Sequence, residues 1–273
     1  MLRRFSSILV AAALLSGCDF AGEEPKPAPT ATASTPTPDA SATGDDAPVG
    51  GARQVSEETD TFLFEYAYPA EAGEIPGLAA WLDLRLDRQR EALAREASDG
   101  RDQARDNGFP FNKYSSGTAW EVVADLPGWL SLSANLDSYQ GGAHPNYGFD
   151  ALVWDKENDR PLEPVSFFAS AEALDAALGE RLCEALNAER AERRGEPVEE
   201  GSDGTFDTCI KPDETNVLLG SSNGRHFDRV GIQIAPYLAG PYAEGAYEFT
   251  FEVDDDLLAI VRPEYRVAFG AEE

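Results

Sequence analysis

Alternation of apolar and polar positions predicts most of the strands in this chain. Phe62, Phe64, Tyr66 and Tyr68 occupy every second position, which is the period of a strand with one buried face. The same alternation recurs at 120–124, 130–136, 147–153, 230–234 and 247–253. A further strand is expected to end at Leu219, before the turn Gly220-Ser221-Ser222-Asn223-Gly224.

Apolar residues at helical spacing predict two main helices. One opens at Pro76 and carries Leu78, Leu82, Leu86 and Leu93 on one face. The other carries Leu174, Leu178, Leu182 and Leu186, with Cys183 beside that stripe. Asp254 is expected to cap a short final helix, because a carboxylate accepts hydrogen bonds from the first free N–H groups.

These elements predict an α+β fold built from antiparallel sheets with packed helices. Each half of the folded part combines a helix with several strands, without a strict internal repeat. We therefore expect two subregions, at 56–160 and 161–273. The apolar share of 42% and the aromatic share of 10% are enough for a real core.

The first residues have the pattern of an export signal. Arg3 and Arg4 precede an apolar run from Ile8 to Leu15, which is too short to span a bilayer. The following Leu15-Ser16-Gly17-Cys18 resembles the lipobox of bacterial lipoproteins. The resemblance implies a signal peptide at 1–17, cleavage before Cys18, and acylation of Cys18 with palmitate or a similar chain. The alternative is an ordinary signal peptide with a fortuitous cysteine.

Residues 18–55 are predicted to form a disordered, acylated tether. Pro, Ala, Thr, Ser and Gly dominate this segment, and it has no apolar periodicity. Such a composition cannot bury enough surface to offset the entropy cost of ordering the chain.

If Cys18 is acylated, Cys183 and Cys209 are the two cysteines that remain. An even pair in an oxidising compartment predicts a disulfide, which would stabilise the fold by roughly 3–4 kcal/mol. The alternative is two separate buried thiols.

The charge balance is strongly acidic, with 22 basic residues against 50 acidic ones and a net charge of −28. Nucleic acid is therefore not expected as a partner, because phosphate binding needs Lys and Arg. The acidic surface favours steering of cationic partners, or it serves only for solvation. Basic residues do gather at Arg85, Arg88, Arg90 and Arg95, which we interpret as a solvated helix face with pairs such as Glu91 to Arg95.

His144 is the best single candidate for chemistry. It lies in the Gly-rich connection 139–146, and Ser138, Asp137 and Asp150 nearby suggest a catalytic set, but no nucleophile-elbow pattern accompanies them. We favour a structural or ligand-binding role, in which Gly141 and Gly142 let the chain turn and the ring bonds to nearby backbone.

Metal and carboxylate chemistry find little support. His144 and His226 are too far apart in sequence for a zinc motif, so no metal and no cofactor are expected. With 50 acidic residues, pairs of carboxylates suited to glycoside hydrolysis are unavoidable and indicate nothing specific. Tyr237 and Tyr242 lie in a connection rich in Pro and Gly. They either cover the end of a sheet or form an exposed contact surface.

Two segments together resemble one family of the cell envelope. The stretch Ser138-Tyr139-Gln140-Gly141-Gly142-Ala143-His144-Pro145-Asn146 is similar to the Tyr-x-Gly-Gly-Ala-His segment of the extracytoplasmic region shared by RsiV and PdaC. The run from Ile234 through Gly245 resembles the C-terminal block of that family. The resemblance would cover about Thr59 to Phe269, with 56–160 PdaC-like and 161–273 RsiV-like.

The resemblance implies an extracytoplasmic α+β module. In RsiV this region is a receptor for lysozyme, and in PdaC it accompanies a separate deacetylase domain. We expect neither a sigma-binding segment nor an appended deacetylase domain with this sequence, so neither activity is transferred to it. The residues expected to contact a ligand are Tyr139, Gly141, Gly142, His144, Asn146, Tyr237 and Tyr242.

The sequence therefore predicts a lipoprotein anchored to the cell membrane, facing the periplasm in a Gram-negative cell. We expect a non-catalytic binding or sensing module, not an enzyme, with lysozyme or peptidoglycan as the ligand. The alternative is a peptidoglycan-modifying enzyme or accessory that uses His144. A third reading is a structural envelope lipoprotein without a small ligand.

Overall fold

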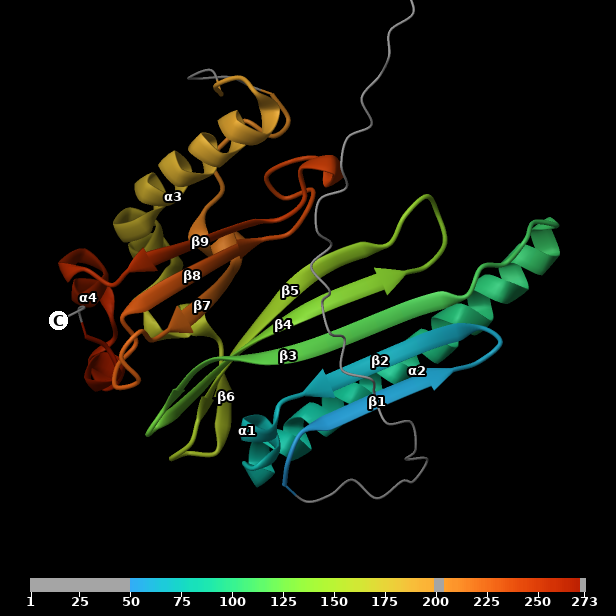
Figure 1. Cartoon of the computed structure of the whole chain (residues 1–273), viewed down its shortest axis with the longest axis horizontal. Coiled ribbons are helices and arrows are strands. Elements are labelled where there is room, and N and C mark those ends of the chain that lie inside the picture. Colours follow the sequence, from blue (N-terminus) through green and yellow to red (C-terminus); the bar gives the residue numbers. More distant parts are fainter. Residues whose placement is uncertain (1–49, 199–203, 271–273) are drawn as a thin grey trace, which may run out of the picture. The chain divides into compact units, whose positions relative to one another are not determined.

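The computed structural model describes residues 50–198 and 204–270 (Figure 1). The predicted signal peptide, Cys18 and nearly all of the predicted tether lie outside these residues, as do residues 199–203 and 271–273. Within the described part, no helix combines the length and the apolar character that a bilayer crossing requires. The fold is α+β, as predicted.

The larger sheet has six strands in the order β1-β2-β3-β4-β5-β6. Its elements are β1 (Arg53–Glu58), β2 (Phe62–Tyr68), β3 (Tyr114–Leu126), β4 (Trp129–Tyr139), β5 (Asn146–Asp155) and β6 (Arg160–Leu162). The helices α1 (Ala70–Gly73) and α2 (Pro76–Asn107) lie between β2 and β3 in sequence.

One strand pair of the larger sheet departs from the antiparallel pairing that the sequence predicts. β2 and β3 run parallel, with Phe62 opposite Tyr114 and Tyr66 opposite Thr118. The physical reason is the long connection: the 32-residue α2 returns the chain to the end of the sheet where β2 began, and only a crossover of this length permits parallel pairing.

The folded chain also begins earlier than predicted, because β1 starts at Arg53 inside the segment assigned to the tether. Val55 is the single large apolar residue of this strand, so it has no alternating pattern to detect. Pairing of β1 with β2 supplies the structure instead, with Val55 opposite Tyr66.

The leucines of α2 face the larger sheet, as predicted. Leu78, Leu82 and Leu86 are buried against rings of β2 and against Trp120 and Leu132. Pro76 stands at the helix start, and Gly108 ends the helix with a φ of 73°, which glycine adopts without strain.

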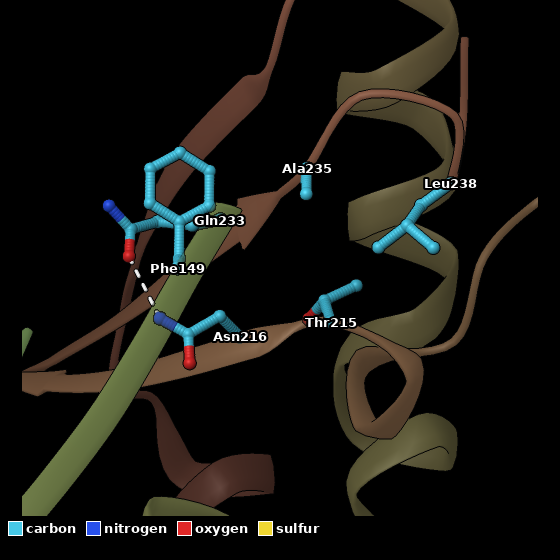
Figure 2. Close-up of a pocket in the computed structure, with 6 residues that line it drawn as sticks. All are labelled: Phe149, Thr215, Asn216, Gln233, Ala235 and Leu238. Carbon is cyan, nitrogen blue, oxygen red and sulfur yellow. Dashed lines mark hydrogen bonds between the residues drawn. The ribbon is translucent and has the colours of Figure 1, made fainter. Parts of the chain in front are cut away.

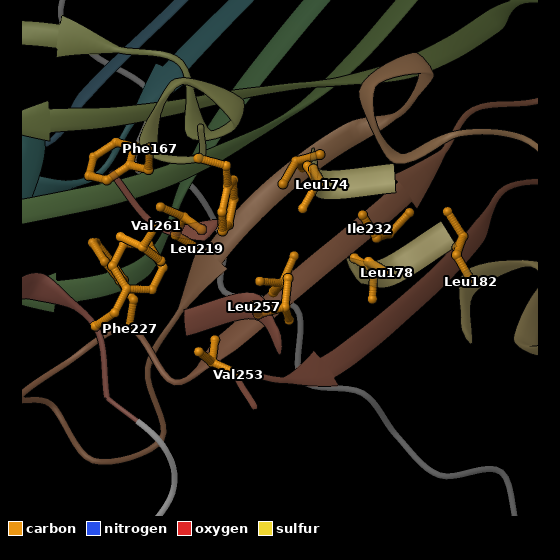
Figure 3. Packing of buried hydrophobic residues seen from close by; sticks show 14 of the residues in the cluster. Phe167, Leu174, Leu178, Leu182, Leu219, Phe227, Ile232, Val253, Leu257 and Val261 are labelled. Atoms are coloured by element: carbon orange, nitrogen blue, oxygen red, sulfur yellow. The ribbon is translucent and has the colours of Figure 1, made fainter. Parts of the chain in front are cut away.

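The smaller sheet has the order β7-β8-β9 and is antiparallel throughout. Its elements are β7 (Asn216–Gly220), β8 (Arg229–Ile234) and β9 (Tyr247–Glu252), with the helices α3 (Ala171–Arg194) and α4 (Asp255–Ile260). The leucine stripe of α3 is buried in a second core, together with Leu219, Ile232 and Leu257 (Figure 3). Asp254 caps α4 through the N–H of Leu257 at 3.0 Å, as predicted.

Short 3-10 helices complete the described part of the chain. They are η1 (Pro164–Phe167), η2 (Pro212–Glu214), η3 (Tyr242–Glu244) and η4 (Pro263–Ala268). Strands of the larger sheet contribute to both cores: Leu130 and Leu152 belong to the core under α2, whereas Leu126 and Val153 belong to the core under α3.

The basic cluster on α2 is only partly a solvated face. Arg95 pairs with Glu91 at 3.9 Å on the surface, as predicted. Arg85 differs: its side chain is two-thirds buried, binds Asp150 and lies 4.7 Å from the ring centre of Trp81. Because Asp150 and Arg85 join β5 to α2, this pair supports packing of the helix on the sheet.

Candidate functional site

The connection between β4 and β5 turns through two glycines, as predicted. Gly141 and Gly142 have φ values of 88° and 108°, which side-chain-bearing residues rarely adopt. The Tyr139 hydroxyl donates to the carbonyl of Gly142 at 3.2 Å and so closes the loop. Gln140 donates to Glu96 of α2 at 2.6 Å, which ties the loop to the helix.

Both ring nitrogens of His144 have partners. Nδ1 lies 2.9 Å from the carbonyl oxygen of Pro145, and Nε2 lies 3.2 Å from the hydroxyl of Tyr237. Because a carbonyl only accepts, Nδ1 carries a proton in this arrangement, and in the neutral ring Nε2 accepts from Tyr237. The bond from the ring to nearby backbone agrees with the structural interpretation of His144.

The suggested Ser–His–Asp set is not assembled. Among the described residues, no hydrogen bond joins His144 to Ser138, Asp137 or Asp150, and Asp150 is engaged with Arg85. A triad needs the base within reach of the nucleophile and a carboxylate behind the base.

Four aromatic side chains meet here, and we call them the aromatic cluster: His144 of the β4–β5 connection, Tyr147 at the start of β5, and Tyr237 and Tyr242 of the β8–β9 connection. His144 stacks on Tyr242 with ring centres 3.9 Å apart and planes 23° apart. Tyr147 meets Tyr242 edge-on at 6.0 Å, and its hydroxyl accepts from the N–H of Ala246 at 3.0 Å. The cluster therefore joins the β4–β5 connection to the β8–β9 connection.

The aromatic cluster is open to solvent on one side. Tyr237 is 51% exposed and Tyr147 is 39% exposed, whereas His144 and Tyr242 are half-buried. The sequence left open whether the tyrosines cover the end of a sheet or are exposed, and Tyr237 is exposed. Tyr237 also has a φ of 71°, which is rare for a bulky residue and costs about 1–3 kcal/mol.

The structure brings together only some of the residues predicted to contact a ligand. His144, Tyr237 and Tyr242 meet in the aromatic cluster, and Tyr139, Gly141 and Gly142 lie in the adjoining loop. Asn146 lines a different pocket of about 320 Å³, together with Gln89 and Ser138. In strand geometry Asn146 and Tyr147 point to opposite faces of β5, so Asn146 lies outside the cluster.

Sequence reasoning missed Tyr147 and a small pocket beside it. A pocket of about 220 Å³ lies where β5 meets β7 and β8, and Figure 2 shows the six residues that line it. These residues are Phe149, Thr215, Asn216, Gln233, Ala235 and Leu238. The sequence did show that Tyr147 and Phe149 alternate on one face of β5. This alternation does not reveal that the start of β5 remains accessible to solvent on that face.

Arg190 of α3 holds the β8–β9 connection in place. Its side chain is fully buried, and its guanidinium donates twice to the carbonyl of Ala239, at 3.0 and 2.8 Å. It also donates to the carbonyls of Asp207 and Thr208, at 3.4 and 3.2 Å. Burial lowers the pKa of Arg190, with a further contribution from the neighbouring cation of Arg194.

The predicted disulfide between Cys183 and Cys209 is present, with Cα atoms 5.2 Å apart. It fastens to α3 the segment whose carbonyls, at Asp207 and Thr208, receive hydrogen bonds from Arg190. The disulfide and Arg190 therefore hold the C-terminal half of α3, residues 207–209 and the β8–β9 connection together.

Glu244 completes the support of this connection. Burial alone would raise the pKa of Glu244, but hydrogen bonds from Arg194 and Tyr247 outweigh it and keep that pKa below its ordinary value of 4.5. Arg194 donates to both carboxylate oxygens, at 2.8 and 3.2 Å. Burial, with the bond to Glu244, raises the pKa of Tyr247 to about 12.

Within residues 50–198 and 204–270, no three His, Cys, Asp or Glu side chains are grouped so that they could hold a metal ion. The arrangement offers aromatic rings, amides and hydroxyls at the surface. Those groups suit contact with a sugar or with a protein surface.

Comparison with known proteins confirms the resemblance that the loop sequence indicated. Residues 55–147 match the family model described as "Deacetylase PdaC". The match includes the β4–β5 connection and ends before β8, so the run from Ile234 to Gly245 lies outside it. No curated protein matches the chain.

Two solved structures of the DUF3298 family are similar in fold. One, from Bacteroides fragilis NCTC 9343, has a TM-score of 0.50 and 17% identity, covering 79% of this chain and 94% of the other. The second, from Pseudomonas aeruginosa PAO1, has a TM-score of 0.46 and 14% identity, covering 83% and 100%. At this identity the first likeness shows the fold alone. The match of residues 55–147 to the family model is consistent with a domain of the PdaC/RsiV type.

Proposed function

We propose that this chain is a non-catalytic binding module of the bacterial cell envelope and that the aromatic cluster is its contact surface. The observation that carries the proposal is Tyr237, whose ring is half exposed although its backbone is held at a φ of 71°. Strain that presents a ring to solvent is not explained by packing, and strained residues concentrate at functional sites.

The non-catalytic part of the proposal is supported by the hydrogen bonds of His144. Its two nitrogens bond to Pro145 and Tyr237, so the ring is used to fix the cluster and has no serine or carboxylate partner among the described residues. This supports a contact role more than general-base chemistry, which needs a nitrogen directed at a reacting proton.

The proposal includes the location of the protein outside the cytoplasm. The lipobox-like sequence before Cys18 supports export, acylation of Cys18 and a flexible tether ahead of β1. The Cys183–Cys209 disulfide supports an oxidising compartment, because such bonds are rare in the cytosol. Within the envelope, the expected ligand is a cell-wall glycan or lysozyme, which is the ligand that the resemblance to RsiV suggests.

Retention of the full, oxidised chain on purified peptidoglycan and on immobilised lysozyme tests this function. We expect retention on at least one of them and a loss of at least about tenfold in affinity for Tyr242→Ala, because central aromatic side chains carry much of the energy of such contacts. Leu84→Ala is the control, since Leu84 is 56% exposed on α2 and lies outside the cluster.

Two outcomes would contradict the proposal. Retention on neither material would remove the binding function. Turnover of peptidoglycan by the wild-type chain that is lost in His144→Ala, with the thermal stability unchanged, would show that the module is an enzyme.

A further inference from the structure

The Cys183–Cys209 disulfide lies at the surface of the molecule. Cys209 is exposed and Cys183 is half-buried. Neither cysteine belongs to the core under α2 or to the core under α3. A thiol in solution can therefore approach this bond from the side of Cys209 without opening either core.

The disulfide and two arginines attach residues 204–209 to α3. None of these residues belongs to either core. Arg190 donates to the carbonyls of Asp207 and Thr208. Arg194 binds the carboxylate of Asp207 at 2.8 Å. Water can replace such polar contacts once the covalent bond is open, because no buried apolar side chain holds the segment in place.

Consecutive hydrogen bonds connect the disulfide to the β8–β9 connection. Asn187 Nδ2 donates to the sulfur of Cys183 at 3.6 Å, and Asn187 Oδ1 accepts from Arg190 at 2.9 Å. Arg190 donates in turn to the carbonyl of Ala239, in the connection that presents Tyr237. One guanidinium therefore holds the disulfide-linked segment on one side and the β8–β9 connection on the other.

Release of residues 207–209 would bring water to the buried guanidinium of Arg190. Two of its acceptors, the carbonyls of Asp207 and Thr208, would leave with the segment. Water would then compete for the hydrogen bonds to Ala239, which are stronger in a dry environment than in a wet one. The β8–β9 connection should therefore loosen, while α3 stays packed through its leucine stripe.

We infer that the Cys183–Cys209 disulfide is a redox switch for the β8–β9 connection. The closed bond holds the connection and the tyrosines of the aromatic cluster that it carries. A dithiol reductant, such as a dithiol oxidoreductase of the envelope, opens the bond and releases them. The effect on ligand binding rests on the proposed function, whereas the effect on the connection does not.

The step is a thiol–disulfide exchange. A thiolate of the reductant bonds to the Cys209 sulfur, the bond between the two protein sulfurs breaks, and the Cys183 sulfur leaves as a thiolate. The second thiolate of the reductant then displaces the Cys209 sulfur. The chain gains two electrons and two protons, the dithiol becomes a disulfide, and the reverse exchange closes the switch. The amide of Asn187 favours opening, because a hydrogen-bond donor stabilises the departing thiolate of Cys183.

Hydrogen exchange of the full chain carrying Cys18→Ser tests the switch, because Cys183 and Cys209 are then its only cysteines. The oxidised chain is compared with the same chain kept in dithiothreitol without denaturant. We expect amide exchange across residues 235–246 to become at least about tenfold faster on reduction. Exchange across residues 62–68 of β2 should not change, and oxidised dithiothreitol should restore the slow exchange.

Variants of this chain locate the effect. The double substitution Cys183→Ser and Cys209→Ser fixes the open form, so exchange across residues 235–246 should be fast and dithiothreitol should change nothing. Asn187→Leu keeps the disulfide but removes both hydrogen bonds between it and Arg190, so exchange in this connection should be faster even in the oxidised form. Gln103→Leu, at an exposed amide of α2, is the matched control and should behave as the parent chain.

Three outcomes would overturn the switch. They are a disulfide that dithiothreitol opens only in denaturant, a reduced chain with unchanged exchange across residues 235–246, and faster exchange in both cores that reoxidation does not reverse. The last result would mark the bond as a general support of the fold.

The proposed function is judged separately. If lysozyme or peptidoglycan retains the oxidised chain, reduction should lower that affinity at least about tenfold, and an unchanged affinity would refute control of binding by the switch. If neither material retains the chain, the proposed function fails, whereas faster exchange on reduction still supports a redox-controlled connection.

Discussion

Tyr237 combines two features that folding does not require in one residue, an exposed ring and a backbone at positive φ. Its hydroxyl reaches His144 Nε2 at 3.2 Å, and its N–H donates to the carbonyl of Gly240 at 2.9 Å. These contacts hold the turn but bury little surface. The position is therefore one where stability and function are expected to diverge.

Replacing Tyr237 should separate these two contributions. We expect Tyr237→Gly to be more stable than Tyr237→Ala by about 1 kcal/mol, because glycine adopts a φ of 71° without strain and alanine does not. Both variants should lose ligand retention. Urea unfolding gives the free energies, and a glycine variant no more stable than the alanine variant would show that the turn is unstrained.

Glu244 gives a prediction about acid. Its folded pKa lies below the ordinary 4.5, so the folded carboxylate binds its proton less tightly than the unfolded one. The resulting stabilisation is complete above pH 4.5 and is lost as the pH falls through the lower folded pKa. The unfolding temperature of the wild type should therefore exceed that of Glu244→Gln at pH 7, and the difference should shrink towards pH 3. A difference independent of pH would contradict the linkage.

At the scale of residues, the sequence identified the Gly-rich β4–β5 connection but not the pocket beside the aromatic cluster. Gly141, Gly142 and His144 were found because their types are unusual in a hairpin connection. Asn216 and Gln233 were not, because polar residues on the outer face of a strand are ordinary. Their meeting at the pocket between β5, β7 and β8 depends on the pairing of segments that are far apart in the sequence.

At the scale of elements, α3 fixes the β8–β9 connection through a buried cation. The guanidinium of Arg190 has carbonyls of Ala239, Asp207 and Thr208 as acceptors, and the side-chain oxygen of Asn187 as a fourth at 2.9 Å. Such a cation is tolerated in a core because its donors are satisfied. Its removal leaves several carbonyls without donors.

Arg190→Met should lower the free energy of unfolding by about 3 kcal/mol or more, because buried carbonyls lose their partners. Hydrogen exchange should also become faster across residues 235–246. Arg105→Met is the matched control, since Arg105 makes exposed ion pairs at the end of α2 and should cost less than about 0.5 kcal/mol. Unchanged exchange in that connection would show that Arg190 is not its support.

The helices and strands with strong hydrophobic periodicity were predicted well, whereas the way the strands of the larger sheet pair was not. The leucine stripes found α2 and α3, and the alternating runs found β2, β4, β5, β8 and β9. β1 was not predicted because its pairing with β2, and not its own composition, gives it structure. The parallel pairing of β2 and β3 escaped because hydrophobic period defines the buried face of a strand but not its direction.

At the scale of the whole described unit, the larger sheet links the two cores. Leu130 of β4 and Leu152 of β5 face the core under α2, while Leu126 of β3 and Val153 of β5 face the core under α3. The boundary between 160 and 161 expected from sequence remains a prediction. Strands shared in this way favour one cooperative unit.

Leu82→Ala and Leu182→Ala test this cooperativity, because each leucine is fully buried in a different core. Each change should cost about 2–5 kcal/mol and lower the same single transition in thermal unfolding. Two separate transitions, each sensitive to only one substitution, would show that the subregions unfold independently.

The edge position of β1 has a mechanical consequence. β1 is hydrogen-bonded on one side only, and its first residue, Arg53, pairs with Tyr68, the last residue of β2. Tension applied through residue 50 therefore loads the Arg53–Tyr68 pair first and then each following pair in turn, so the strand peels away stepwise. Val55 is the one large apolar residue that β1 adds to the core under α2, so peeling of β1 should remove little of the apolar contact in that core and none from the core under α3.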